Sequence, residues 1–275
     1  MTMASWLPAV LYAAAAATYL ANFAQPKPGL GRAATALLGA GVLAHTFLIG
    51  MQTVQAGYAP LVGTTAAVSA FVWLLGLAYL YIELSTDERA MGAFVTVLMA
   101  ALAILPALNP GVESRPPLLR SPLFTIHVLS LLFAYASFAL AFVLGITYVL
   151  LFKEIKAKHL GFFYARLPSL QALDMMNARA IGVGWALLTA GVIVGAVWAT
   201  QVHASPDPHA RAMSFADPKI LLALLCWAMY TFAFVARGVI GWSGRRAAWL
   251  SAIGFVIVLL NFLPVGYFLT RSHNF

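Results

Sequence analysis

Long apolar runs alternate with short charged spacers along the whole chain, and this pattern predicts membrane-spanning helices. Each run is long enough to cross about 30 Å of hydrocarbon as a helix. Helix is expected because an open strand would leave its backbone unpaired in lipid, and the runs lack the alternation of a transmembrane barrel. The eight predicted spans are Trp6–Phe23, Ala33–Gln52, Leu61–Ile82, Met91–Leu108, Leu123–Phe152, Ala180–Thr200, Ile220–Ala236 and Ala247–Thr270.

The composition agrees with this pattern. Hydrophobic residues make up 63% of the 275 residues, and charged residues make up only 9%. A soluble domain of this length has too little interior to bury so much apolar surface. We therefore predict an all-α fold, a polytopic helix bundle of about eight transmembrane helices that forms a single membrane domain over residues 1–275.

The spacers that hold most of the basic residues all fall on one side of the predicted bundle. These residues are Lys27, Arg32, Arg89, Lys153, Lys156, Lys158, Arg166, Arg179, Arg237, Arg245 and Arg246. The other side has Arg115, Arg120, Arg211, Lys219 and Arg271. The positive-inside rule makes the richer side cytoplasmic and places both termini outside, which in a bacterium is the periplasmic face of the inner membrane. The net charge of +8 is explained by these spacers and the lipid bilayer, and no nucleic-acid partner is expected.

Small and apolar residues suggest how the helices pack. Gly191 and Gly195 form a G-x-x-x-G pair that we expect to serve packing within the monomer. The single cysteine, Cys226, lies inside a span and is expected to pack there, with no disulfide. In the spacer 153–179, leucines and a methionine recur every three residues after Pro168, which predicts a short helix lying at the membrane interface.

Three histidines are candidates for chemistry. His45 lies inside the second span, where an ionisable group faces a partner or a cavity. His127 opens the fifth span and His273 follows the eighth, so both are predicted at the outer face. The remaining histidines, His159, His203 and His209, fall in spacers and are expected to be solvated.

Two histidines at similar depth on separate helices would suit bis-histidine ligation of a haem iron. Haem also needs an apolar slot and cations for its propionates. The residues available for the slot are Phe124, Trp198, Phe215, Tyr267 and Phe268, and those available for the propionates are Arg115, Arg120 and Arg271. Interfacial histidines and aromatic belts also occur in polytopic proteins without haem, so the residues alone leave haem binding open.

Four stretches in the second half resemble the cytochrome c assembly family, the CcsA/CcmC/CcmF group of haem-handling membrane proteins. They are Ser121–Ala136, Leu173–Ala199, Asp217–Lys219 with Cys226–Tyr230, and Gly241–Ala248 with the following span and its S-H-N-F end. This resemblance covers roughly residues 120–275. Residues 1–110 are less specific, but His45 and Trp73–Leu84 make this half similar to the shorter HemX or YpjD members.

The resemblance implies a function in cytochrome c biogenesis. It makes His127 and His273 the outer ligands of haem b, and it matches Asp217 and Lys219 to the end of the family's outer loop. It also makes His45 a candidate ligand inside the membrane. Such a protein presents haem at the periplasmic face to apocytochrome c or to a periplasmic assembly partner. Whether the chain itself belongs to a haem lyase, or cytochrome c synthase, system is left open.

The chain departs from the family pattern in one outer loop. Residues 200–219 contain no tryptophan, where the family loop is tryptophan-rich, and Phe215 stands two residues before Asp217. This difference keeps two alternatives open. One is a HemX-like scaffold or regulator, and the other is an accessory subunit of a membrane electron-transfer complex, each without a catalytic haem site.

Overall fold

The computed structural model describes residues 2–111, 117–158, 161–203 and 218–260, and these ranges are helical apart from short connections. They contain eight α-helices and one short 3-10 helix, η1, over Pro117–Arg120. The α-helices are α1 (Thr2–Ala24), α2 (Pro28–Ala56), α3 (Thr64–Thr86), α4 (Gly92–Leu108), α5 (Pro122–Lys156), α6 (Leu170–His203), α8 (Pro218–Val239) and α9 (Arg245–Leu260).

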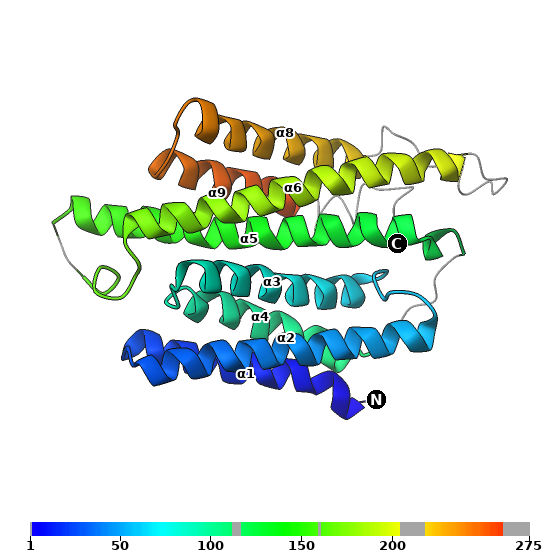
Figure 1. Ribbon diagram of the computed structural model, residues 1–275, viewed down its shortest axis with the longest axis horizontal. Coiled ribbons are helices and arrows are strands. Elements are labelled where there is room, and N and C mark those ends of the chain that lie inside the picture. Colours follow the sequence, from blue (N-terminus) through cyan, green and yellow to red (C-terminus); the bar gives the residue numbers. More distant parts are fainter. Residues whose placement is uncertain (1, 112–116, 159–160, 204–217, 261–275) are drawn as a thin grey trace.

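The helices run up and down, so that successive connections alternate between the two ends of the bundle (Figure 1). The connections α1–α2, α3–α4, α5–α6 and α8–α9 lie at one end, on the left of Figure 1. These connections and the helix ends beside them carry the basic residues assigned to one side from sequence, so we call this the basic end. The structure therefore groups the basic spacers as predicted.

The described helices confirm a polytopic helical membrane protein. Six of them are long and apolar enough to cross a membrane by length and composition: α1, α2, α3, α5, α6 and α8. Helix α4 is shorter, with 17 residues, and α9 is described only as far as Leu260. The expected number of spans, about eight, agrees with this set.

The bundle has two helix groups that meet along α3 and α5. Helices α1–α4 lie together on one side of Figure 1, and α5, α6, α8 and α9 lie on the other. Helix α5 is the central element, with fully buried side chains that include Phe138, Leu140 and Leu144. Cys226 of α8 is buried in the same core, which confirms its predicted packing role.

A row of glycines on α6 lets it lie close to α5. A Cβ atom added at Gly184 would fall 2.4 Å from the Phe138 ring, and one at Gly191 would fall 3.0 Å from Leu131. One at Gly195 would meet His127 at 2.5 Å. Lipid supplies no hydrophobic drive between helices, so close contact of this kind holds them together. The expected packing role of the G-x-x-x-G pair within the monomer is confirmed.

The predicted interfacial helix after Pro168 is wrong as a separate element. Helix α6 begins at Leu170 and continues without a break, with the Ser169 hydroxyl accepting from the Ala172 N–H at 3.1 Å at its start. Leu173 and Met176 are fully buried in the bundle core. The apolar stripe that suggested a surface-lying helix therefore packs against protein and lengthens the sixth span toward the basic end.

Candidate functional site

His127 lies in the second turn of α5, at the end of the bundle opposite the basic end. The local sequence determines this position, because Ser121 precedes the helix and its hydroxyl accepts from the Leu123 N–H at 3.2 Å. Pro122 follows in the first helical position, where its fixed backbone and missing N–H are tolerated. The S-P start therefore fixes where α5 begins, and His127 meets Gly191 of α6 from the second turn.

The hydrogen bond of His127 selects its tautomer. Its Nδ1 lies 2.8 Å from the backbone oxygen of Gly191 on α6. A carbonyl oxygen only accepts hydrogen bonds, so Nδ1 carries the proton and donates it. In the neutral ring, Nε2 is then the unprotonated nitrogen. This is the arrangement found for metal-ligating histidines, whose second ring nitrogen donates to a backbone carbonyl or a carboxylate.

The space for the imidazole comes from a missing side chain on α6. The three atoms nearest to a Cβ added at Gly195 all belong to His127: Cε1 and Nδ1 at 2.5 Å and Cγ at 3.3 Å. Any larger residue at position 195 would push the ring out of this place. Gly191 and Gly195 thus position His127 together, one through its carbonyl oxygen and the other through the room it leaves.

An aromatic wall lies beside the histidine. The Trp198 ring is stacked with the imidazole, with 6.5 Å between ring centroids and 20° between planes. Phe124 packs edge-on against Trp198 at 5.1 Å, and both are buried in a small apolar cluster with Leu119. Two of the aromatic residues proposed from sequence for a haem slot are therefore brought together with His127.

Arg120 is the candidate propionate cation that the structure describes. It ends η1, two residues before α5 begins, and its guanidinium lies 5.2 Å from the centre of the Tyr58 ring. It therefore lies at the same end of the bundle as His127. Lys219 lies in the first turn of α8, but its side chain is outside the described residues. The other residues named from sequence also lie outside the described residues: Arg115, Asp217, Phe215, Tyr267, Phe268, Arg271 and His273.

His45 belongs to a different part of the molecule. It lies on α2 with 2% of its surface exposed, and in Figure 1 α3 lies between α2 and α5. Its Nδ1 is 3.1 Å from the Tyr12 hydroxyl, and its Nε2 is 2.9 Å from the Ser69 hydroxyl. Both ring nitrogens are thus engaged by neighbouring helices, as in a core histidine. Binding a metal there would require one of these two bonds to open.

Two polar clusters at the basic end were not expected from sequence. Glu83 of α3, with 1% exposure, accepts hydrogen bonds from the hydroxyls of Tyr19, at 2.7 Å, and of Thr35. These two bonds join α3 to α1 and α2. Asp174 forms a bidentate ion pair with Arg237, at 3.0 and 2.7 Å. In the sequence, each cluster was marked only by an acidic residue near the end of an apolar run. The partners of that acidic residue lie on helices distant in sequence, so the cluster itself could not be predicted.

The comparisons with known proteins agree with the resemblance seen in the sequence. The family model described as "Cytochrome C assembly protein" matches residues 35–273. The cytochrome c biogenesis protein CcsA of Guillardia theta is 28% identical over 250 residues, covering 84% of this chain and 81% of its own. The protein of the same name from Microcystis aeruginosa is 26% identical over 297 residues, covering 90% and 88%. The matched range contains both His45 and His127, and the chain belongs to the cytochrome c assembly protein family.

Proposed function

We propose that the chain handles haem b in cytochrome c biogenesis and holds it beyond the end of the bundle opposite the basic end, with His127 as an iron ligand. The single observation that supports this most strongly is the pairing of His127 Nδ1 with the Gly191 carbonyl oxygen. It places the ring proton on Nδ1, so Nε2 is the nitrogen that would ligate the iron. The Gly195 cradle and the Trp198 wall fix the ring orientation.

The rest of the proposed site comes from the sequence. His273 is the proposed second ligand, and Arg120, Arg271 and Lys219 are the proposed partners of the propionates. Phe215 and Asp217 belong to the same proposed outer loop. When bound, haem supplies the vinyl groups that become thioether bonds with apocytochrome c, and the protein supplies ligation and orientation.

The distribution of basic residues gives the proposed orientation. The basic end faces the cytoplasm under the positive-inside rule, so His127 faces the periplasm of a bacterial inner membrane. Apocytochrome c, or an assembly partner that carries it, would then meet the haem on the outer side. The proposed role of the chain is to position haem there for a partner membrane complex.

A visible spectrum of the protein purified in detergent tests this function. We expect a Soret band and the reduced bands of a b-type haem, which His127→Ala removes. His159→Ala is the matched control, because it removes a histidine from the basic spacer, and it should leave the spectrum unchanged. Added imidazole should restore part of the spectrum to His127→Ala, since a small ligand can occupy the vacated position.

The opposite outcome is equally clear. A colourless protein would contradict the proposal, as would a His127→Ala variant that supports cytochrome c maturation as well as the unmodified chain. A colourless protein that still binds assembly partners would instead support the HemX-like scaffold role. That alternative was kept open because the outer loop contains no tryptophan.

A further inference from the structure

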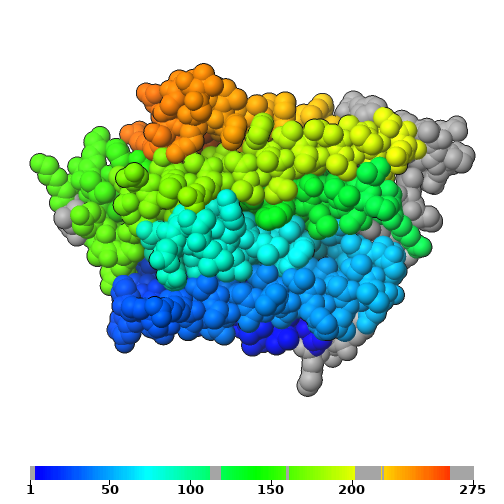
Figure 2. Space-filling model, in the orientation of Figure 1, coloured from blue at the N-terminus to red at the C-terminus, as the bar shows by residue number. Residues whose placement is uncertain are grey.

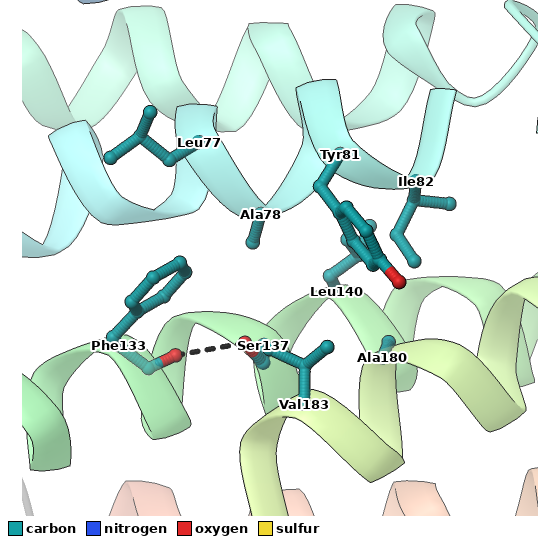
Figure 3. A pocket seen from close by; sticks show the side chains of 9 residues that line it. All are labelled: Leu77, Ala78, Tyr81, Ile82, Phe133, Ser137, Leu140, Ala180 and Val183. Carbon is teal, nitrogen blue, oxygen red and sulfur yellow. Dashed lines mark hydrogen bonds between the residues drawn. The ribbon is translucent and has the colours of Figure 1, made fainter. Parts of the chain in front are cut away.

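An apolar groove opens between α3, α5 and α6, where the two helix groups meet. It has a cavity volume of about 350 Å³. Figure 2 shows α3, in cyan, beside α6, in yellow-green, on this face of the molecule. Figure 3 shows the lining side chains, which are Leu77, Ala78, Tyr81, Ile82, Phe133, Ser137, Leu140, Ala180 and Val183.

The lining favours a hydrocarbon chain. Its one aliphatic hydroxyl, on Ser137, donates to the Phe133 backbone oxygen at 2.9 Å within α5. None of the nine lining residues is a histidine, cysteine, methionine, lysine or arginine, so Tyr81 is the one lining side chain of a type that ligates haem iron, and no lining residue is a cation. Haem would therefore meet one phenol, and no imidazole, thiolate or thioether, in this lining. The Tyr81 hydroxyl supplies a polar tip, and 52% of that residue is exposed.

The groove is also short for a helix from another protein. At a rise of 1.5 Å per residue, it extends about 8 Å along α3, from Leu77 to Ile82, and about 10.5 Å along α5, from Phe133 to Leu140. A docked helix presents anchor residues over at least two turns, or about 11 Å. A flexible acyl chain needs no such length, and it can enter from the surrounding bilayer.

A cation stands at the mouth of the groove toward the basic end. Arg179 precedes the lining residue Ala180, and its Nη1 donates to the Ser85 backbone oxygen of α3 at 2.8 Å. Ser85 lies one helical turn beyond Tyr81. Within the described ranges the ion pairs join Arg89 to Asp87 and Arg237 to Asp174, and neither includes Arg179. A guanidinium has five N–H donors, so several remain for an anion.

We propose that this groove binds one anionic phospholipid, with an acyl chain against the apolar lining and the phosphate on the Arg179 guanidinium. Basic pockets between membrane helices bind acidic lipid head groups in this way. The lipid contacts α3 from one helix group and α5 and α6 from the other. Its binding therefore stabilises the seam between the two groups, independently of haem.

The test is to measure the lipid retained by the intact protein. The protein is reconstituted in nanodiscs of equal parts phosphatidylglycerol and phosphatidylcholine, then extracted in detergent, and bound lipid is quantified by mass spectrometry. We expect the unmodified protein to retain phosphatidylglycerol in preference to phosphatidylcholine. Arg179→Gln should lower the retained phosphatidylglycerol about tenfold, since a hydrogen bond to a charged group contributes about 1.5 kcal/mol or more. Arg179→Lys should keep part of it.

Filling the groove gives a second, independent variant. Val183→Trp places a large ring in the groove from α6 and should reduce retained phosphatidylglycerol to background. Two matched controls should retain lipid normally: Arg32→Gln, which removes an exposed basic-end charge on α2, and Ile193→Trp on the exposed face of α6.

Three results would overturn the proposal. One is equal retention of the two lipids by the unmodified protein, and another is an equal loss in Arg179→Gln and Arg32→Gln. The third is displacement of a Soret-absorbing pigment by Val183→Trp, which would identify the occupant as a porphyrin. If Val183→Trp does not fold, the lipid preference of the unmodified protein and the Arg179 variants still decide the question.

Discussion

The two halves of the chain each contain a histidine and a carboxylate inside the bundle, but they satisfy these groups differently. In the half made of α1–α4, His45 and Glu83 meet side-chain hydroxyls. These belong to Tyr12, Ser69, Tyr19 and Thr35. In the half made of α5–α9, His127 meets the backbone oxygen of Gly191, and Asp174 meets Arg237 and the Gly244 N–H.

This difference separates a structural histidine from a candidate ligand. A hydroxyl can donate or accept, so Tyr12 and Ser69 leave the tautomer of His45 undetermined and engage both of its nitrogens. A backbone carbonyl only accepts, so Gly191 fixes the proton of His127 on Nδ1. The comparison predicts that changes around His45 and Glu83 lower stability, whereas changes around His127 lower haem binding.

The largest expected effect is on stability, at Glu83. Glu83→Ala leaves the Tyr19 hydroxyl without its acceptor and leaves Thr35 with only the Gly31 backbone oxygen, at 3.0 Å, so we expect a loss of about 3 kcal/mol in the free energy of unfolding. Glu83→Gln should cost less, because its amide can still bond to both hydroxyls. Unfolding in dodecyl sulfate, followed by circular dichroism, measures both variants. An equal loss in the two would show that the negative charge, rather than the hydrogen bonds, is what matters.

The next effect tests the ligand side of the comparison. Gly195→Ala puts a methyl group where the His127 ring lies, and we expect haem affinity to fall about thirtyfold, the equivalent of about 2 kcal/mol of overpacking. Gly182→Ala is the matched control on the same helix, because its nearest neighbour would be 3.9 Å away. Titration of haem into the purified variants measures the affinity. A Gly195→Ala protein with normal affinity would remove His127 from the site.

The fold was largely predictable from sequence because run length and basic spacers are strong signals in a membrane. Run length predicted the helices, and the basic spacers predicted which connections lie at the basic end. The stretch 170–179 was misassigned because its apolar stripe fits either an interfacial helix or a buried one. Leu173 and Met176 face the core because α6 packs against α5 from this end of the helix onward, as the bond from the Asn177 side chain to the Ala141 backbone oxygen shows.

The candidate site was predictable in part. His127, Phe124 and Trp198 were recognised by residue type and depth, and the structure brings them together. The Gly191 carbonyl was not predictable, because a backbone partner depends on the register between α5 and α6. The partners of Glu83 were missed for the same reason, since they come from α1 and α2.

A smaller stability effect is expected at His45, without any spectral change. His45→Leu removes two hydrogen bonds, but Tyr12 and Ser69 can partly rebond to nearby backbone, so we expect a loss of about 1.5 kcal/mol. The reduced haem spectrum should match that of the unmodified protein when recorded at equal protein concentration. If His45→Leu instead lowers the haem bands by the amount expected for the loss of a second haem, His45 is a ligand inside the membrane. The distinction between a structural histidine in one half and a ligand in the other would then be wrong.

The smallest effect concerns hydrogen bonds that tie α6 to α8. Trp185 Nε1 donates to the Thr231 hydroxyl at 2.9 Å, and Trp227 Nε1 donates to the Thr189 hydroxyl at 3.0 Å. A double-mutant cycle of Trp185→Phe and Thr231→Val isolates the first bond, because phenylalanine keeps the stacking on Phe234. We expect a coupling energy of about 0.6 kcal/mol, the average for side-chain hydrogen bonds between membrane helices.

The same cycle with His45→Leu and Ser69→Ala should give a larger coupling. That bond is shielded more completely, because His45 is 2% exposed and Ser69 is 8% exposed, whereas the Trp185 pair is only partly buried. Equal coupling energies for the His45–Ser69 and Trp185–Thr231 pairs would show that deeper burial does not strengthen the hydrogen bonds of the first half. A larger value for the tryptophan pair would place the stronger polar contacts in the half that carries His127, where a rigid α5–α6–α8 frame would then hold the proposed haem ligand in place.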